Sequence, residues 1–177
     1  MQFWARLLEA VPGSRLLIKG GSAANPSQRE GIFRRFGAAG LDPARLELLP
    51  RTQSINDHLA LYSKIDIALD PFPYNGTTTT CEALFMGVPV VTLAGATHAG
   101  RVGASLLTCV GLPDLVARSE DGYIDIARAL ASDAARRAEL RTNLRAMVLG
   151  SALCDAAAFS QRMDRAFRTM WRTWCSR

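Results

Sequence analysis

Four consecutive threonines, 77–80, follow a short segment rich in proline and glycine, DPFPYNG (70–76). Threonine is a poor helix former, so a run of four gives a helix start no folding advantage over serine, alanine or glutamate. At a helix start, free backbone N–H groups and the positive end of the helix dipole attract an anion. Hydroxyl groups beside them add donors that reach phosphate oxygens. The run therefore indicates a cradle for phosphate.

Glu82 gives the same run a second interpretation. Thr79-Thr80-Cys81-Glu82 matches a capping box, in which the glutamate caps its own helix. A glutamate in the first turn repels phosphate if it faces the ligand, but a carboxylate that points aside can accept both hydroxyl protons of a ribose. The residues alone leave both interpretations open: a structural cap, and a nucleotide site built from the threonines and Glu82.

Further polar residues follow the neighbouring predicted strands. Gln53 and His58 come after the strand 45–50, and His98 lies in the glycine-containing loop after the strand 89–93. Because ligands of open α/β sheets bind beyond the carboxyl ends of the strands, these loops are expected at the same rim as the threonines. The competing interpretation is that the two histidines and Tyr74 are ordinary packing or surface residues.

Strands and helices alternate strictly along the chain. The predicted strands are apolar along their whole length, which is typical of a parallel sheet covered on both faces and joined by right-handed crossovers. The fold class is therefore α/β, a Rossmann-like parallel sheet with helices on both faces, in a single domain over 1–177. The predicted strands are 15–19, 45–50, 66–70, 89–93 and 115–117, and the predicted helices are 1–11, 27–40, 54–65, 79–86, 101–111, 120–132, 133–149 and 155–175.

The chain opens on a predicted helix, whereas a doubly wound domain usually opens on a strand whose following loop meets the ligand. Either the fold begins unusually, or a first strand and its loop lie upstream of a chain that has been cut.

Composition and charge exclude several classes of protein. The net charge is +5, and the densest arginines share helical patterns with Asp and Glu, which favours solvated helix faces over a nucleic-acid surface. We expect no nucleic-acid partner and no membrane partner, because no apolar run is long enough to span a bilayer and the first residues lack the basic segment and apolar segment of a signal peptide. The four cysteines have no metal-like spacing. We predict a cytoplasmic protein with free thiols, no metal site and no catalytic residue in this chain.

The motif PFPYNGTTTTCEALFMGVPVVT (71–92), with the flanking HLALYSKIDIALD (58–70), resembles the carboxyl half of the O-GlcNAc transferase/SPINDLY glycosyltransferases. The ending SALCDAAAFSQRMDRAFRTMWRTWC (151–175) resembles the last helix of that family. The resemblance covers nearly all of the chain, and the arginine-rich composition indicates a bacterial member from a GC-rich genome.

The resemblance implies the second half of a GT-B glycosyltransferase, the half that binds most of the sugar nucleotide. The implied activity is transfer of GlcNAc from UDP-GlcNAc to Ser or Thr of a protein by direct displacement, with no cofactor. The alternatives are a SPINDLY-like domain that takes GDP-fucose and a non-catalytic fragment that binds nucleotide. Human-type transferases carry histidine at the place of Thr77 and aspartate at that of Glu82, whereas plant SPINDLY proteins share the TTTTCE form, so the donor stays open.

The family's binding residues are carried over by position. His58 resembles the histidine near the nucleotide base and phosphate, and Gln53 falls where the main chain meets the base. Glu82 matches the acidic residue on the ribose, and Tyr74 falls close to the sugar pocket. The residues that match the family's diphosphate-binding positions are those of the cradle: Gly76, Thr77, Thr78 and Thr79.

The resemblance also implies partners that lie outside this chain. The amino-terminal catalytic half, with its proposed histidine base, and the TPR region that holds the protein acceptor are both absent. A lysine that pairs with the diphosphate in relatives precedes the stretch present here, and Lys19 is on a different segment. The last predicted helix carries an apolar stripe that is expected to be partly exposed without the other half: Phe159, Met163, Phe167, Met170 and Trp174.

Overall fold

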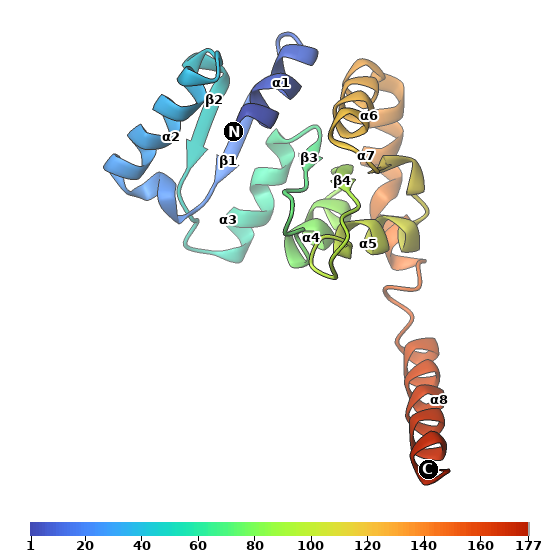
Figure 1. Cartoon of the computed structure of the whole chain (residues 1–177). Helices are drawn as coiled ribbons and strands as arrows, with labels where there is room; N and C mark the ends of the chain where they lie inside the picture. Colours follow the sequence, from blue (N-terminus) through green and yellow to red (C-terminus); the bar gives the residue numbers. More distant parts are fainter. Residues whose placement is uncertain (177) are drawn as a thin grey trace.

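The computed structural model describes residues 1–176 and shows parallel strands flanked by helices (Figure 1). Strands β1 (Leu16–Lys19) and β2 (Leu46–Leu49) pair in parallel, and β4 (Val90–Leu93) pairs in parallel with β3 (Ala68–Leu69) and β5 (Val116–Ala117). The α-helices are α1 (Gln2–Ala10), α2 (Pro26–Ala38), α3 (Ile55–Ala60), α4 (Thr78–Phe85), α5 (Val102–Val110), α6 (Glu120–Ser132), α7 (Ala134–Leu149) and α8 (Ala156–Cys175).

The predicted parallel α/β architecture is confirmed, with one difference in the sheet. Within residues 1–176 the strands form two hydrogen-bonded sheets, β1-β2 and β3-β4-β5, instead of one. Strand β3 is shorter than the predicted 66–70, and the N–H groups of Ala68 and Asp70 are both directed to β4, where they bond the carbonyls of Pro89 and Val91. Among the described residues, strand β3 therefore makes no backbone hydrogen bonds to β1. The part of the chain around the sheet β1-β2 and the part around the sheet β3-β4-β5, called the two halves of this chain below, are linked by side-chain contacts.

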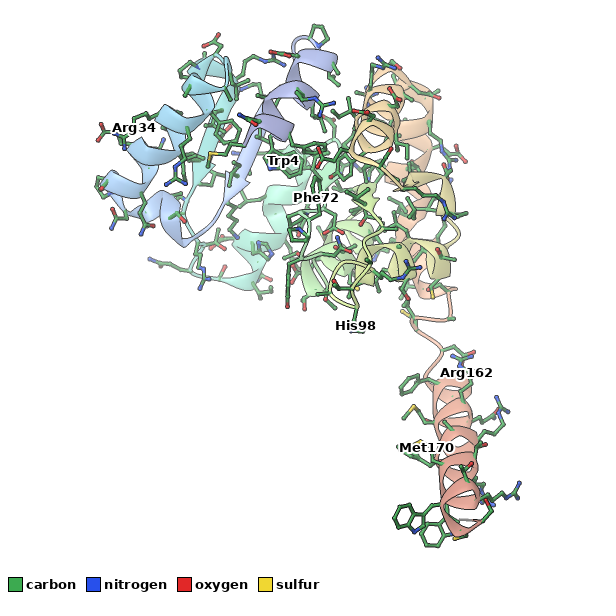
Figure 2. The ribbon with its side chains drawn as sticks, in the orientation of Figure 1. Trp4, Arg34, Phe72, His98, Arg162 and Met170 are labelled. Carbon is green, nitrogen blue, oxygen red and sulfur yellow. The ribbon has the colours of Figure 1, made fainter. Side chains whose placement is uncertain are left out.

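Helix α1 joins the two halves through its aromatic residues. Each half has its own apolar core, and Trp4 packs against both cores. The Phe3 ring lies edge-on to Phe72 and to Tyr123, with centroids 4.8 and 5.3 Å apart. Trp4 and Phe72 are neighbours in the middle of the molecule (Figure 2). The first helix is thus packed against the turn that precedes the threonines.

Local sequence signals set several helix ends as expected. The Ser54 hydroxyl accepts a hydrogen bond from the Asp57 N–H and caps α3, which continues as a 3₁₀ turn over Leu61–Lys64. Gly87 follows α4 with a φ of +78°, and a β-carbon there would lie 2.6 Å from the Arg141 carbonyl oxygen. Only glycine fits both requirements, so α4 ends there and α7 packs closely beside it.

Helix α8 stands apart from the body of the molecule (Figure 1). None of its residues is buried, and its apolar side chains are open to solvent; Trp174, for example, is 70% exposed. Figure 2 shows Arg162 and Met170 on this isolated helix. The expected exposure of the apolar stripe is confirmed. Among the described residues, no helix is long and apolar enough to cross a membrane.

Candidate functional site

The segment 70–76 forms a turn that is fixed by the buried carboxylate of Asp70. Oδ1 of Asp70 accepts the Gly76 N–H at 2.7 Å, and Oδ2 accepts the Thr92 hydroxyl at 2.6 Å. The Tyr123 hydroxyl donates to the Asp70 carbonyl oxygen at 3.2 Å. Burial raises the pKa of Asp70 above its ordinary value, although the two hydrogen bonds oppose the rise. Asp70 therefore ties the start of the turn to its end and to β4.

Asn75 holds the middle of the same turn. Its Nδ2 donates to the Pro71 carbonyl at 3.1 Å, and its Oδ1 accepts the Gly103 N–H of α5 at 3.4 Å. Its backbone N–H bonds the Ala99 carbonyl at 3.0 Å. An amide that is 1% exposed and bonded to three segments cannot shift alone. The turn is thus a rigid frame for the threonine run that follows it.

The amino end of α4 is open. Thr77 is the N-cap without a side-chain cap hydrogen bond, and the side chains of Thr77, Thr78 and Thr79 are exposed. In the described part of the chain, the N–H groups of Thr78, Thr79 and Thr80 have no hydrogen-bond partner, as expected for a first helical turn. Thr80 differs because its hydroxyl is buried and donates to the Gly76 carbonyl at 3.2 Å. Three threonines are available to a ligand and the fourth holds the turn.

The capping-box interpretation of Glu82 is wrong. Its carboxylate does not turn back to the helix start but lies 2.9 Å from Nε2 of His58 on α3. The predicted box also requires the helix to begin after Thr79, whereas α4 begins at Thr78. Helix α3 supplies a partner from a distant segment, and that partner outcompetes the local cap.

Lys19 completes a polar cluster with His58 and Glu82. Its Nζ lies 2.5 Å from Nδ1 of His58 and donates to the Thr52 hydroxyl at 3.0 Å. An ammonium group has no acceptor, so Nδ1 of a neutral His58 must accept and Nε2 must carry the proton that is donated to Glu82. The cluster is thus a chain of hydrogen bonds that runs from the Lys19 ammonium through the His58 imidazole to the Glu82 carboxylate. We call these three residues the relay.

Tyr62, in the 3₁₀ turn that continues α3, packs beside the relay. Its hydroxyl donates to the Thr79 carbonyl at 3.2 Å, and its ring lies edge-on to His58 with centroids 5.6 Å apart. Burial, followed by the nearby negative charge of Glu82, raises the pKa of Tyr62 to about 12. Tyr62 therefore stays protonated at neutral pH, and its hydroxyl group holds the first turn of α4 through the Thr79 carbonyl.

In the part of the chain that the structure describes, hydrogen bonds join only some of the predicted site residues. His58, Glu82 and the threonine run lie at one rim, as the sequence indicated. Gln53 is exposed and has no hydrogen bond to the cluster, and Tyr74 is 75% exposed. His98 lies in an exposed loop, which Figure 2 shows at the edge of the molecule below α4 and α5.

Lys19 is a site residue that the sequence analysis missed. We expected its segment to keep it out of the site, but its ammonium reaches His58 directly. The available signal was its position as the last residue of β1, because the carboxyl ends of parallel strands gather at the ligand rim.

The site's chemistry suits an anionic ligand with vicinal hydroxyls. Free N–H groups, hydroxyls and a helix dipole can bind phosphate, and the Glu82 carboxylate on the next turn can accept hydroxyl protons. In the part of the chain that the structure describes, no group of three or more His, Cys, Asp or Glu side chains could hold a metal ion.

Comparisons with known proteins identify the family to which the chain is similar. The model of glycosyl transferase family 41 matches residues 1–163. The chain is 48% identical over 175 residues to the probable UDP-N-acetylglucosamine–peptide N-acetylglucosaminyltransferase SPINDLY of Petunia hybrida, covering 99% of this chain and 19% of that protein. It is 31% identical over 173 residues to the UDP-N-acetylglucosamine–peptide N-acetylglucosaminyltransferase of Caenorhabditis elegans, covering 97% of this chain and 15% of that protein.

The fold has a close counterpart among solved structures. A mutant of the Thermobaculum terrenum O-GlcNAc transferase superposes with a TM-score of 0.91 and 42% identity, over 99% of this chain and 34% of that chain. The present chain thus corresponds to about a third of that protein and to about a fifth of its plant relatives. A family model that matches nearly the whole chain, together with these relatives, shows that the chain belongs to glycosyl transferase family 41.

Proposed function

We propose that this chain is the donor-binding part of a protein O-glycosyltransferase that transfers GlcNAc from UDP-GlcNAc to a Ser or Thr hydroxyl. The observation that carries the proposal is the open amino end of α4 beside a carboxylate that is held away from it. Family membership and the peptide N-acetylglucosaminyltransferase names of the relatives support the same activity.

In this proposal the donor diphosphate lies against Thr77, Thr78 and Thr79, and the ribose lies against Glu82. Only Oε2 of Glu82 is used by His58, so Oε1 is free to accept a ribose hydroxyl. When the acceptor hydroxyl attacks the anomeric carbon, negative charge grows on the leaving diphosphate. The fixed N–H groups, the hydroxyls and the helix dipole stabilise that charge without having to reorganise.

The acceptor side of the reaction belongs to the proposed amino-terminal half and TPR region. Placing an acceptor hydroxyl in line with the anomeric carbon can contribute roughly 7–11 kcal/mol to catalysis, and this needs a second wall facing the donor. The chain therefore binds donor and contributes the leaving-group stabilisation, while acceptor binding and the base are supplied by the partner half.

A thermal-shift panel with UDP, GDP, UDP-GlcNAc, GDP-fucose and inorganic diphosphate tests the proposal. A ligand at 100 times its dissociation constant should stabilise the chain by about 2.7 kcal/mol. We expect stabilisation by UDP and UDP-GlcNAc. No stabilisation by any nucleotide would refute the donor-binding role, and a preference for the guanine nucleotides would replace UDP-GlcNAc with GDP-fucose as the donor.

Glu82→Ala makes the test specific to the ribose. We expect it to weaken UDP binding far more than inorganic diphosphate binding, whereas Glu30→Ala, at an exposed glutamate of α2, should change neither. Equal losses for both ligands would show that Glu82 only supports the helix.

A further inference from the structure

We propose that Lys19 is a positioning residue: acting through His58, it holds the Glu82 carboxylate away from the amino end of α4 and so keeps the anion cradle open. The inference rests on the proposed function and assigns a role to the Lys19–His58–Glu82 relay.

The geometry gives Lys19 control over the orientation of the His58 ring. Its ammonium is anchored by Thr52 at 3.0 Å and donates to Nδ1 at 2.5 Å. With Nδ1 occupied as an acceptor, the ring proton stays on Nε2, and the Nε2–H bond is aimed at Glu82. The positive charge at one end of the relay and the negative charge at the other favour this single arrangement over its reverse.

Without the ammonium, only the Glu82 carboxylate favours that arrangement, and the Nδ1 side of the ring is no longer held. The ring can then carry its proton on Nδ1, and Nε2 becomes a lone pair that faces a carboxylate 2.9 Å away. Two acceptors at that distance repel each other, so Glu82 loses its partner whenever the ring takes this tautomer. The side chains of both residues are only about one-fifth exposed, at 23% and 20%, so water replaces the lost hydrogen bond poorly.

A released Glu82 can turn toward the amino end of α4. Glu82 is four residues after Thr78, so both lie on one face of the helix, and helical side chains lean toward the amino end. Unpaired N–H groups and the positive helix end lie there. A carboxylate in that position occupies the place of the diphosphate and repels it.

A rival role for Lys19 is direct contact with the diphosphate. Two of its three N–H donors bond to Thr52 and His58, which leaves one for a ligand. The two roles differ in their dependence on Glu82. Direct contact is lost on removal of the lysine whether or not Glu82 is charged, whereas the positioning role has no consequence once the charge of Glu82 is gone.

A double-mutant cycle with inorganic diphosphate as the ligand separates the two roles. Calorimetry on the 177-residue chain compares the wild type, Lys19→Met, Glu82→Gln and the double variant. We expect Lys19→Met to weaken binding about 10-fold or more, because a free carboxylate then lies beside the bound anion. We expect Glu82→Gln to bind at least as tightly as the wild type, and the double variant to lie within about 3-fold of Glu82→Gln.

Lys64→Met is the matched control, since Lys64 is the chain's other lysine and is exposed at the end of the 3₁₀ turn after α3. It makes the same change in charge and side chain away from the relay. Its diphosphate affinity should equal that of the wild type within about 2-fold.

Nitrogen-15 NMR of the His58 ring in the ligand-free chain gives a second readout that a merely structural role would not move. The wild type and Lys64→Met should show one tautomer with the proton on Nε2, Lys19→Met should show a mixture, and Lys19→Arg should restore the single tautomer. Backbone spectra of the same samples establish that each variant is folded.

The outcomes distinguish this inference from the proposed function. If the wild type binds neither inorganic diphosphate nor UDP, the proposed function fails and the relay has no cradle to keep open. If the wild type binds but the double variant stays as weak as Lys19→Met, or the His58 tautomer does not change, the positioning role alone is overturned.

Discussion

Replacing Gly103 by alanine should damage the turn that presents the threonines, although alanine suits a helix better than glycine. Gly103 is buried in the first turn of α5. A β-carbon there would lie 2.3 Å from Oδ2 of Asp70 and 2.3 Å from Oγ1 of Thr92. These two oxygens are joined by the 2.6 Å hydrogen bond that fixes the turn to β4, so neither can move without breaking it.

The magnitude follows from three terms. Overpacking a tight interior costs about 1–3 kcal/mol, and a hydrogen bond to a charged group contributes about 1.5–3 kcal/mol. Alanine in a helix returns up to about 1 kcal/mol relative to glycine. We therefore expect Gly103→Ala to lower the free energy of unfolding by about 2–5 kcal/mol, measured as a shift of the urea midpoint at unchanged slope.

Gly31→Ala is the matched control. Gly31 also lies inside a helix, α2, but the nearest atom to its added β-carbon is Nη2 of Arg34 at 4.0 Å, an ordinary contact. It should gain about 0.5–1 kcal/mol from helix propensity alone. The folded fraction of Gly103→Ala should also bind UDP more weakly. If both variants gain stability alike and bind UDP normally, the Asp70–Thr92 bond does not hold the turn.

Three further predictions concern the cradle and the whole chain. Gly76→Ala puts a β-carbon 2.7 Å from Oγ1 of Thr79, so calorimetry should show diphosphate binding weakened about 10-fold or more; Gly37→Ala, with nothing within 4 Å, should bind normally. The exposed apolar face of α8 should cause self-association that increases with concentration in sedimentation experiments. The double variant Phe167→Glu, Trp174→Glu should abolish this association. A wild-type chain that stays monomeric and binds no apolar dye at high concentration would contradict the prediction. The chain alone should not label lysate proteins from radiolabelled UDP-GlcNAc, whereas adding the matching amino-terminal half should permit labelling; robust labelling by the chain alone would contradict the division of roles.

Most of the fold could be predicted from local signals. Continuous apolar strands, the Ser54 cap and the glycine at 87 each act within a few residues, and the structure contains all the elements that they indicated. The end of the strand 66–70 was less predictable, because Asp70 looks like a strand end in sequence. In the folded chain its side chain instead bonds Gly76 and Thr92 and begins the turn.

The site was predictable where its parts are adjacent in sequence or follow neighbouring strands of the predicted sheet. The threonine run follows its own turn, so the cradle could be recognised directly. The hydrogen bond from His58 to Glu82 could not, because the local pattern offers a cap while His58 is 24 residues away. The partner of that histidine, Lys19, is a further 39 residues away from it, and only the order of the strands brings the three together.

Asp70 and Glu82 illustrate how one short segment uses the same chemical group in two ways. Both carboxylate oxygens of Asp70 accept hydrogen bonds from the protein, and Asp70 is only 3% exposed. Glu82 has Oε2 on His58, and the structure shows no hydrogen bond to its Oε1 within residues 1–176. The first carboxylate is part of the frame, and the second remains available to a ligand.

Replacing each carboxylate by its amide should therefore change different observables. Burial raises the pKa of Asp70 above its value of about 3.9 in the unfolded chain. The folded state then binds more protons than the unfolded state as pH rises from about 4, so stability should fall through the folded pKa. Asp70→Asn can still accept from Gly76 and donate to Thr92; it should remove this pH dependence in urea titrations and leave UDP affinity unchanged. Glu82→Gln should do the reverse, weakening UDP binding with the pH dependence of unfolding intact. If Asp70→Asn shows the wild-type pH dependence, or if the two amides have the same effect on UDP affinity, the separation of frame from ligand site is wrong.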